Sequence, residues 1–356
     1  MMTRVTYQRF MLLLLCVLFA CTKSEHPDNY KIKNFKFEDF PQVEKLEGTK
    51  LNIKELLAPR RILNLKDYLV VSDNRAEYLL YVIDKKNNKV VNSLGVLGRG
   101  PGEIQHAWRL NSTSSDSSFW VYQTSLNKIS KFNVNQSNPF SIDEIDFIKR
   151  NKKDNLFHVN EFTFASDTSF MVTMIDGEDK YVEFDSNMNK LNKYDKWAHM
   201  IEEDFPSPVI SGLYQGALRH TNDYQYFVLA SINLDVIEIL NKETRNVLSL
   251  KGPLNYKPKY TASYDTGEPM LAFFPESRGK YMYLDIACGK EQFYALFAKD
   301  AGYGGFDIFT FDYDGNLITH YELDKKIKRL TVDEQSHKFY GITAGDPEPN
   351  ILVFEY

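Results

Sequence analysis

The sequence contains little cysteine: three residues in 356, at positions 16, 21 and 288. Because only Cys288 lies beyond the N-terminal region, the main part of the chain forms no internal disulfide. A fold without such cross-links must be stabilised by a large core, which about 330 residues can supply. Cys288 itself lies in the apolar stretch YLDIACGK, which indicates a buried structural thiol rather than a nucleophile.

The sequence also lacks an excess of positive charge. The whole chain carries a net charge of −5, and residues 1–20 contain Arg4 and Arg9 but no acidic residue, so the remainder carries −7. No basic stripe is present, which argues against nucleic-acid binding. Aromatic residues, by contrast, make up 14% of the chain. They are typical of strands and of flat ligand-binding surfaces.

Motifs of common catalytic and metal sites are absent. The seven histidines show no zinc spacing such as H-E-x-x-H, and no G-x-S-x-G elbow occurs. DYDGN at 312–316 resembles the start of a calcium loop, but it runs into the strand-like LITHYEL, so a hairpin is predicted instead. The sequence therefore identifies no catalytic residue, metal ligand or cofactor, and it leaves calcium open.

The N-terminus has the features of a lipoprotein signal peptide at residues 1–20. Arg4 and Arg9 form a basic region, and the ten apolar residues at 11–20 are fewer than the about 20 that a spanning helix needs. The following Leu-Phe-Ala-Cys, ending at Cys21, resembles the bacterial lipobox. This predicts acylation of Cys21, palmitate included, and a lipidated tether over 21–30. The alternative is an ordinary secretory signal with an incidental cysteine.

Short strand-like runs recur along the chain, whereas runs with helical periodicity are scarce. Six stretches each contain an aromatic or apolar strand, a polar bend and a second apolar strand; they begin at Tyr68, Ser118, Ser169, Gln225, Gln292 and Lys338. In the first five, a polar hairpin leads into a third strand. A shorter strand candidate precedes each unit: RRILNL, HAWRLN, NEFTFA, GALRHT, YMYLDIA and IKRLTV. Four strands in each of six units predict an all-β, six-bladed β-propeller, formed as a single domain by residues 31–356.

The last unit stops at Tyr356 after its third strand, which would leave a sheet edge exposed. Either KIKNFKFEDF at 31–40 or TKLNIKELL at 49–57 is free to fill that edge. We therefore expect a clasp between the two termini that closes the ring. An eight-bladed propeller or a β-sandwich would need more or fewer units than the sequence contains.

The lipobox, the six degenerate units and the GRGPGE loop at 98–103 together resemble the TolB-like six-bladed propeller lipoproteins of Bacteroidetes. The resemblance covers nearly the whole chain after the signal peptide. It implies a propeller fold and a location in the cell envelope, and it carries no catalytic residues over. Thr22 stands where some bacteria use aspartate to retain lipoproteins at the inner membrane, so the outer membrane is favoured.

The glycine-rich stretch GVLGRGPGEI at 95–104 connects the first unit to the second. A phosphate-binding loop needs a helix behind its glycines, and here a strand candidate follows. We interpret the stretch as a shaped crossover loop in which Gly98, Gly100 and Gly102 adopt positive φ.

Side chains beside these glycines allow two interpretations. In the first, Arg99 and Glu103 form structural contacts that hold neighbouring blades together. In the second, Arg99 and Glu103 line the mouth of the central channel together with His106 and Trp108, and these four residues contact a ligand.

Two connections, 195–216 and 251–280, are longer than is usual for a connecting loop. We expect both on the same face as the glycine-rich loop. The second is rich in aromatic residues, and Tyr260 and Tyr264 are its predicted ligand contacts. The alternative is that these rings pack inward on the propeller.

These features favour a binding or assembly module over an enzyme. The predicted protein is an envelope lipoprotein, held at the membrane by its lipid, whose propeller face binds a glycan, peptide or protein partner. The alternative is a propeller hydrolase or lyase acting on glycans or small esters, with or without calcium. Its acids and amides would come from inner strands and bends: Asp73, Asn74, Glu161, Asp176, Asn233 and Asp285.

Overall fold

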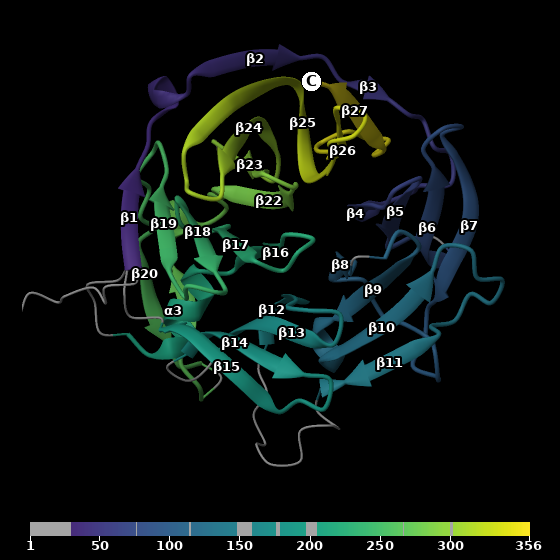
Figure 1. Ribbon diagram of the computed structural model, residues 1–356, viewed down its shortest axis with the longest axis horizontal. Coiled ribbons are helices and arrows are strands. Elements are labelled where there is room, and N and C mark those ends of the chain that lie inside the picture. Colours follow the sequence, from purple (N-terminus) through teal and green to yellow (C-terminus); the bar gives the residue numbers. More distant parts are fainter. Residues whose placement is uncertain are drawn as a thin grey trace, which may run out of the picture.

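The computed structural model describes residues 30–75, 77–113, 115–147, 159–175, 179–196, 205–265, 267–299 and 302–356. The predicted signal peptide, Cys21 and Asp176 lie outside the described residues. Strands predominate, and their sheets are arranged as a ring (Figure 1). The protein is an all-β propeller.

Three sheets of four antiparallel strands come first in the chain. The first sheet contains β4 (Pro59–Asn64), β5 (Tyr68–Asp73), β6 (Tyr78–Asp84) and β7 (Lys89–Val96). The second contains β8 (Arg109–Asn111), β9 (Ser118–Gln123), β10 (Lys128–Asn133) and β11 (Asp143–Asp146). The third contains β12 (Val159–Phe164), β13 (Ser169–Met174), β14 (Asp179–Asp185) and β15 (Lys190–Lys196).

The next sheet has five strands because an N-terminal strand joins it. It contains β16 (Gly216–His220), β17 (Tyr226–Ser231), β18 (Val236–Asn241), β19 (Val247–Lys251) and, at its outer edge, β1 (Tyr30–Asn34). A separate hairpin pairs β20 (Tyr260–Ser263) with β21 (Met270–Phe273). The described helical elements are α3 (Ser207–Leu213) and three short 3-10 turns, η1 (Phe37–Asp39), η2 (Thr124–Leu126) and η4 (Pro275–Ser277).

The last sheet has eight strands in the order β22-β23-β24-β25-β26-β27-β3. The eighth, β2, lies beside β25. Strand β25 is long enough for its first part to pair with β24 and its last part with β26. The bounds are β2 (Gln42–Leu46), β3 (Thr49–Lys50), β22 (Tyr283–Cys288), β23 (Gln292–Phe297), β24 (Gly305–Asp312), β25 (Leu317–Asp333), β26 (Lys338–Thr343) and β27 (Ile351–Glu355).

The ring has two distinct faces, because each inner strand starts at one face and ends at the other. Connections from one sheet to the next, and bends between second and third strands, lie on what we call the crossover face. Hairpins between third and fourth strands lie on the opposite face, the hairpin face. The short candidates predicted to precede each unit are β4, β8, β12, β16, β22 and the last part of β25. Figure 1 shows the labelled strands among them nearest the centre.

Middle strands of the sheets are buried on both faces, and their sequences show this. Strand β5, YLVVSD, is apolar over four successive residues and buried from Leu69 onward. Such strands lie between two neighbouring sheets, so both faces contribute to the core. The outer strand β7 alternates between exposed and partly buried positions over its first four residues instead, since one of its faces meets solvent there.

Several hairpins are stabilised by an aspartate that ends the third strand. The carboxylate of Asp312 accepts hydrogen bonds from the amides of Asp314, at 3.0 Å, and Asn316, at 2.7 Å. Asp185 makes the same contacts with the amides of Asn187 and Asn189. The DYDGN stretch is therefore the hairpin between β24 and β25, as predicted.

Residues 30–50, called the strap below, run around the outside of the ring (Figure 1). Strand β1 pairs in parallel with β19, β2 pairs in parallel with β25, and β3 pairs antiparallel with β27. Of the two candidate segments, TKLNIKELL is thus the one that pairs with the C-terminal strand. The strap also contributes side chains to the core. The ring centroids of Phe35 and Phe311 are 5.2 Å apart, and those of Phe40 and Phe309 are 5.1 Å apart. No helix in the described residues is both long and apolar enough to cross a membrane.

Candidate functional site

The glycine-rich loop follows β7 and leads to β8, so it is a connection on the crossover face. Its backbone is bonded to the next sheet. The amide of Gly95 donates to the carbonyl of Pro139 at 2.7 Å, and the amide of Ser141 donates to that of Gly102 at 2.8 Å. The main chain, rather than the Arg99 side chain, therefore fastens this loop to its neighbour.

The prediction of positive φ for all three glycines is wrong at Gly98 and Gly100. Within the loop only Gly95 and Gly102 have positive φ, at 74° and 76°. Gly98 and Gly100 are explained by Glu103, which folds back over them. Its Oε2 accepts a hydrogen bond from the amide of Gly100 at 2.7 Å, and a Cβ on Gly98 would lie 1.9 Å from the same oxygen.

The side chains predicted to share one ligand site lie in different places. Arg99 is exposed and forms no ion pair with a described residue, and Glu103 is bonded within its own loop. His106 and Trp108 line a pocket of about 350 Å³, which we call the mouth pocket. Tyr260 lines another, and Tyr264 is 60% exposed and lines neither.

The mouth pocket opens on the crossover face. It is lined by Arg60, Arg61, Asn74, His106, Ala107, Trp108, Tyr303, Lys328 and Arg329. The residues come from the start of β4, the bend after β5, the connection before β8, the bend between β23 and β24, and the last part of β25. Its lining contains four cationic side chains and no carboxylate.

A central cluster contains one charged side chain from each central strand: Arg61, Arg109, Glu161, Arg219, Asp285 and Arg329. Arg61 and Arg329 of this cluster also line the mouth pocket. In four of these strands the pairing register shifts by a bulge immediately before the charged residue: before Arg61, Glu161, Asp285 and Arg329. A bulge changes the direction of the next side chain, which explains how a charged residue turns away from an otherwise apolar face.

Only some of these charges are paired. Arg109 donates to both carboxylate oxygens of Glu161, at 2.8 and 2.6 Å, and Arg219 donates to Asp285 at 3.0 Å. Each carboxylate thereby has an arginine partner. Arg61 and Arg329 form no ion pair with a described residue.

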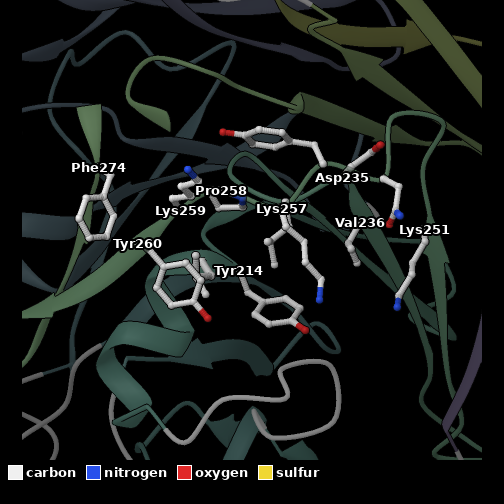
Figure 2. Close-up of a pocket in the computed structure, with 13 residues that line it drawn as sticks. Tyr214, Asp235, Val236, Lys251, Lys257, Pro258, Lys259, Tyr260 and Phe274 are labelled. Carbon is white, nitrogen blue, oxygen red and sulfur yellow. The ribbon is translucent and has the colours of Figure 1, made fainter. Parts of the chain in front are cut away.

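The second pocket is a groove of about 420 Å³ beside the β20–β21 hairpin, shown in Figure 2. Its lining combines aromatic rings and lysines: Leu213, Tyr214, Leu234, Asp235, Val236, Lys251, Asn255, Tyr256, Lys257, Pro258, Lys259, Tyr260 and Phe274. In Figure 2 the ring of Tyr260 lies between those of Tyr214 and Phe274. The groove also lies on the crossover face, since it contains the bend after β17 and the connection after β19.

Asp235 is the buried acid of this groove. Burial raises the pKa of its carboxyl group, while its hydrogen bonds act in the opposite direction. The carboxylate accepts from the amide of Leu254 at 2.7 Å and from the hydroxyl of Tyr283 at 3.0 Å. These contacts hold the base of the long 251–280 connection, so Asp235 shapes the groove.

Of the polar residues proposed for an enzyme, Glu161 and Asp285 lie in the central cluster, where each is paired with an arginine. Asp73 accepts from the amides of Leu57 and Ala58, at 2.8 and 2.7 Å, so it closes a turn. Among the described residues, no three His, Cys, Asp or Glu side chains are placed to hold a metal ion. Burial raises the pKa of Cys288 to about 12, which leaves its thiol protonated and unreactive.

Sequence comparison places this architecture in a family. A model of the TolB-like 6-blade propeller-like family matches residues 36–335. The chain belongs to that family. No curated protein matches the sequence.

Two solved structures share the fold of this TolB-like propeller and resemble it only weakly in sequence. One is a member of the DUF4221 family from Bacteroides vulgatus, with 14% identity and a TM-score of 0.60, covering 88% of this chain and 96% of that one. The other is a protein from Bacteroides fragilis that is described as exported, with 11% identity and a TM-score of 0.56, covering 91% and 98%. At these identities the likeness shows the fold alone.

Sequence reasoning missed the four cationic residues that line the mouth pocket of this TolB-like propeller, Arg60, Arg61, Lys328 and Arg329, and it also missed Tyr303. A signal was present, because RRILNL and IKRLTV are both short inner-strand candidates that contain adjacent basic residues. Basic pairs are unusual in a strand that lies at the centre of a fold. That mismatch could have indicated that these basic side chains lie beside a pocket at the centre of the ring.

Proposed function

We propose that this protein is a lipid-anchored binding module of the bacterial envelope, whose crossover face takes a glycan, peptide or protein partner. The groove of about 420 Å³ carries the proposal, because it combines aromatic walls with lysines and lies on long connections of that face. Aromatic rings bind sugar rings and apolar side chains, and the lysines favour partners with acidic groups. Anchoring through Cys21 at the outer membrane is part of the same proposal.

The blade count belongs to this proposal as well. We infer six blades, with the eight-stranded sheet counted as two that share the long strand β25. Two observations support this count. The last part of β25 packs against both β22 and β4, which makes it one member of a closed circle of inner strands. The pairing of β3 with β27 supplies the outer strand that the final blade otherwise lacks.

A screen with matched variants tests the groove. The purified protein is screened against glycan fragments and envelope-derived peptides, and any binder is measured again with Tyr260→Ala and Tyr264→Ala. We expect Tyr260→Ala to weaken binding at least about tenfold, because its ring lines the groove. Tyr264→Ala is the control, since this exposed tyrosine of the same connection lies outside the groove. Equal affinity for the wild type and Tyr260→Ala would place the binding surface elsewhere.

Anchoring is tested separately by Cys21→Ser. The variant loses the thiol that would be acylated, so we expect it to leave the membrane fraction and to lose incorporation of labelled palmitate. Retention of the variant in the membrane fraction would show that another feature holds the protein there.

A further inference from the structure

The charges at the centre of the ring do not balance. Apart from the rim residues Arg60 and Lys328, the central strands contribute four arginines and two carboxylates to the central cluster: Arg61, Arg109, Arg219, Arg329, Glu161 and Asp285. Since both carboxylates are paired with Arg109 and Arg219, two buried guanidinium groups remain without an acidic partner in the described part of the chain. These are Arg61, 8% exposed, and Arg329, 4% exposed.

Within the residues that the structure describes, both guanidinium groups donate only to neutral oxygen atoms. Arg61 donates to the carbonyls of Trp108, at 2.5 Å, and Arg60, at 3.2 Å. Arg329 donates to backbone carbonyls and to the hydroxyl of Tyr303. Carbonyls and a phenol satisfy hydrogen bonds, but they do not neutralise charge.

Two N–H donors at this pocket also lack a hydrogen-bond acceptor among the described residues. The Nε of Arg329 and the Nε1 of Trp108 are buried and have no hydrogen-bond partner among the described residues. A buried donor without a partner costs about 1–3 kcal/mol, so proteins rarely keep one without a use for it. Both donors belong to residues that line the mouth pocket.

The rim of the pocket adds further positive charge. Arg60 is exposed and Lys328 is half-buried, and neither forms an ion pair with a described residue. The nearby Asp73 does not neutralise them by contact, since its carboxylate is bonded to the amides of Leu57, Ala58 and Arg75.

The pKa values of two side chains reflect the positive potential of the site. Burial, together with Arg60 and Arg329, lowers the pKa of Lys328 to about 8. Burial acts to raise the pKa of Tyr303, yet the pKa is lowered, because Arg329, Arg61 and Arg109 favour the phenolate. An environment that disfavours a cation and favours a phenolate also favours other oxyanions.

We propose that the mouth pocket binds the oxyanion group of a small organic molecule. Arg61, Arg329, Arg60 and Lys328 are the anion-binding residues, and Trp108 and Tyr303 contact the body of the ligand. Guanidinium groups bind carboxylate, phosphate and sulfate oxygens through paired N–H donors. A volume of about 350 Å³ is in the range of small-molecule sites, so it accommodates a molecule of monosaccharide size.

This site is independent of the groove in the proposed function. The mouth pocket and the groove share no lining residue. Failure of one proposal therefore leaves the other intact.

The experiment compares four sugars that differ in one group: glucuronate, glucose 6-phosphate, glucose 6-sulfate and neutral glucose. Binding to the full-length protein is measured by isothermal titration calorimetry at low salt. We expect at least one charged sugar to bind with a dissociation constant below about 1 mM, and glucose not to bind. The charged sugar that binds most tightly identifies the oxyanion. No binding of any charged sugar, or equal binding of glucose, would overturn the proposal.

Variants then locate the binding site. Lys328→Gln and Arg60→Gln, at the rim, should weaken binding at least about tenfold, and Arg61→Gln should abolish it. Lys290→Gln removes the same charge at the opposite end of the channel and should leave binding unchanged. Because Arg61→Gln carries the greater risk to folding, the two rim variants decide the result. Full affinity in both, or equal losses with Lys290→Gln, would show that the anion does not bind in this pocket.

Discussion

Arg109 and Glu161 form a bidentate ion pair at the centre of the ring, with N–O distances of 2.8 and 2.6 Å. Both side chains are buried. The same guanidinium also donates to the carbonyl of Gly216 at 2.6 Å, so one side chain joins strands of three sheets. The pair therefore neutralises Glu161 and fixes the positions of neighbouring inner strands.

Arg109→Met should destabilise the protein by about 3–5 kcal/mol, because it leaves the Glu161 carboxylate buried without its partner. Adding Glu161→Gln should recover a large part of this loss, since an amide carries no charge. Urea denaturation of the two variants and the wild type measures the difference. An equal loss of stability in the single and double variants would mean that the packing of Arg109, not its charge, stabilises the fold.

The glycines of the crossover loop should respond differently to substitution. Gly102→Ala should cost about 1–3 kcal/mol, because φ is 76° and a Cβ would lie 2.8 Å from the Cβ of Phe140. Gly98→Ala meets only the Glu103 carboxylate, so its cost should fall when it is combined with Glu103→Ala. A double-mutant cycle by thermal denaturation checks this. Additive effects at Gly98 and Glu103 would contradict the explanation.

Because of Lys328, the free energy of unfolding should change with pH in the alkaline range. Its pKa is lowered from 10.5 to about 8 by burial and by Arg60, Arg329 and Arg61, with Asp73 acting in the opposite direction. The folded state therefore disfavours the charged lysine. The destabilisation is full below pH 8 and is relieved between pH 8 and 10.5, where the unfolded chain binds more protons.

Lys328→Gln should consequently melt at a higher temperature than the wild type at pH 7, by on the order of 1 °C. The difference should shrink as the pH is raised toward 10. Melting curves of both proteins between pH 7 and 10 measure it, with Lys290→Gln as the control for loss of a surface charge. A variant that melts lower than the wild type at pH 7 would show that Lys328 stabilises the unliganded fold.

The strap should be needed for stability of the whole ring. Deletion of residues 31–57 exposes the edges of β19, β25 and β27 and removes Phe35 and Phe40 from the core. Phe35→Ala alone should cost about 3–5 kcal/mol, whereas Lys31→Ala, on the exposed side of β1, should cost under about 0.5 kcal/mol. Thermal denaturation measures each effect. An unchanged melting temperature in the variant that lacks residues 31–57 would show that the strap does not stabilise the ring.

Much of the fold could be predicted from local patterns, because each unit repeats the same order of apolar runs and polar turns. Of the central charges, Glu161 and Asp285 were placed on inner strands from the sequence, whereas Arg61 and Arg329 were not. A bulge before Arg61 and before Arg329 shifts the side-chain alternation by one residue, and no local pattern marks such a shift. The positions of the Glu103 and Tyr264 side chains could not be predicted from the sequence either, because they depend on the conformations of the connecting loops.

The direction of β1 has a consequence for how the protein stands on a membrane. Tyr30 pairs with Val247, at the start of β19, so the chain enters the domain at the hairpin face. If Cys21 carries the lipid, as proposed, the nine residues from there to Tyr30 form a leash with a reach of at most about 30 Å. Under that proposal the attachment point lies on the hairpin face, and both pockets lie on the opposite face, which would leave them accessible to molecules in the surrounding solution.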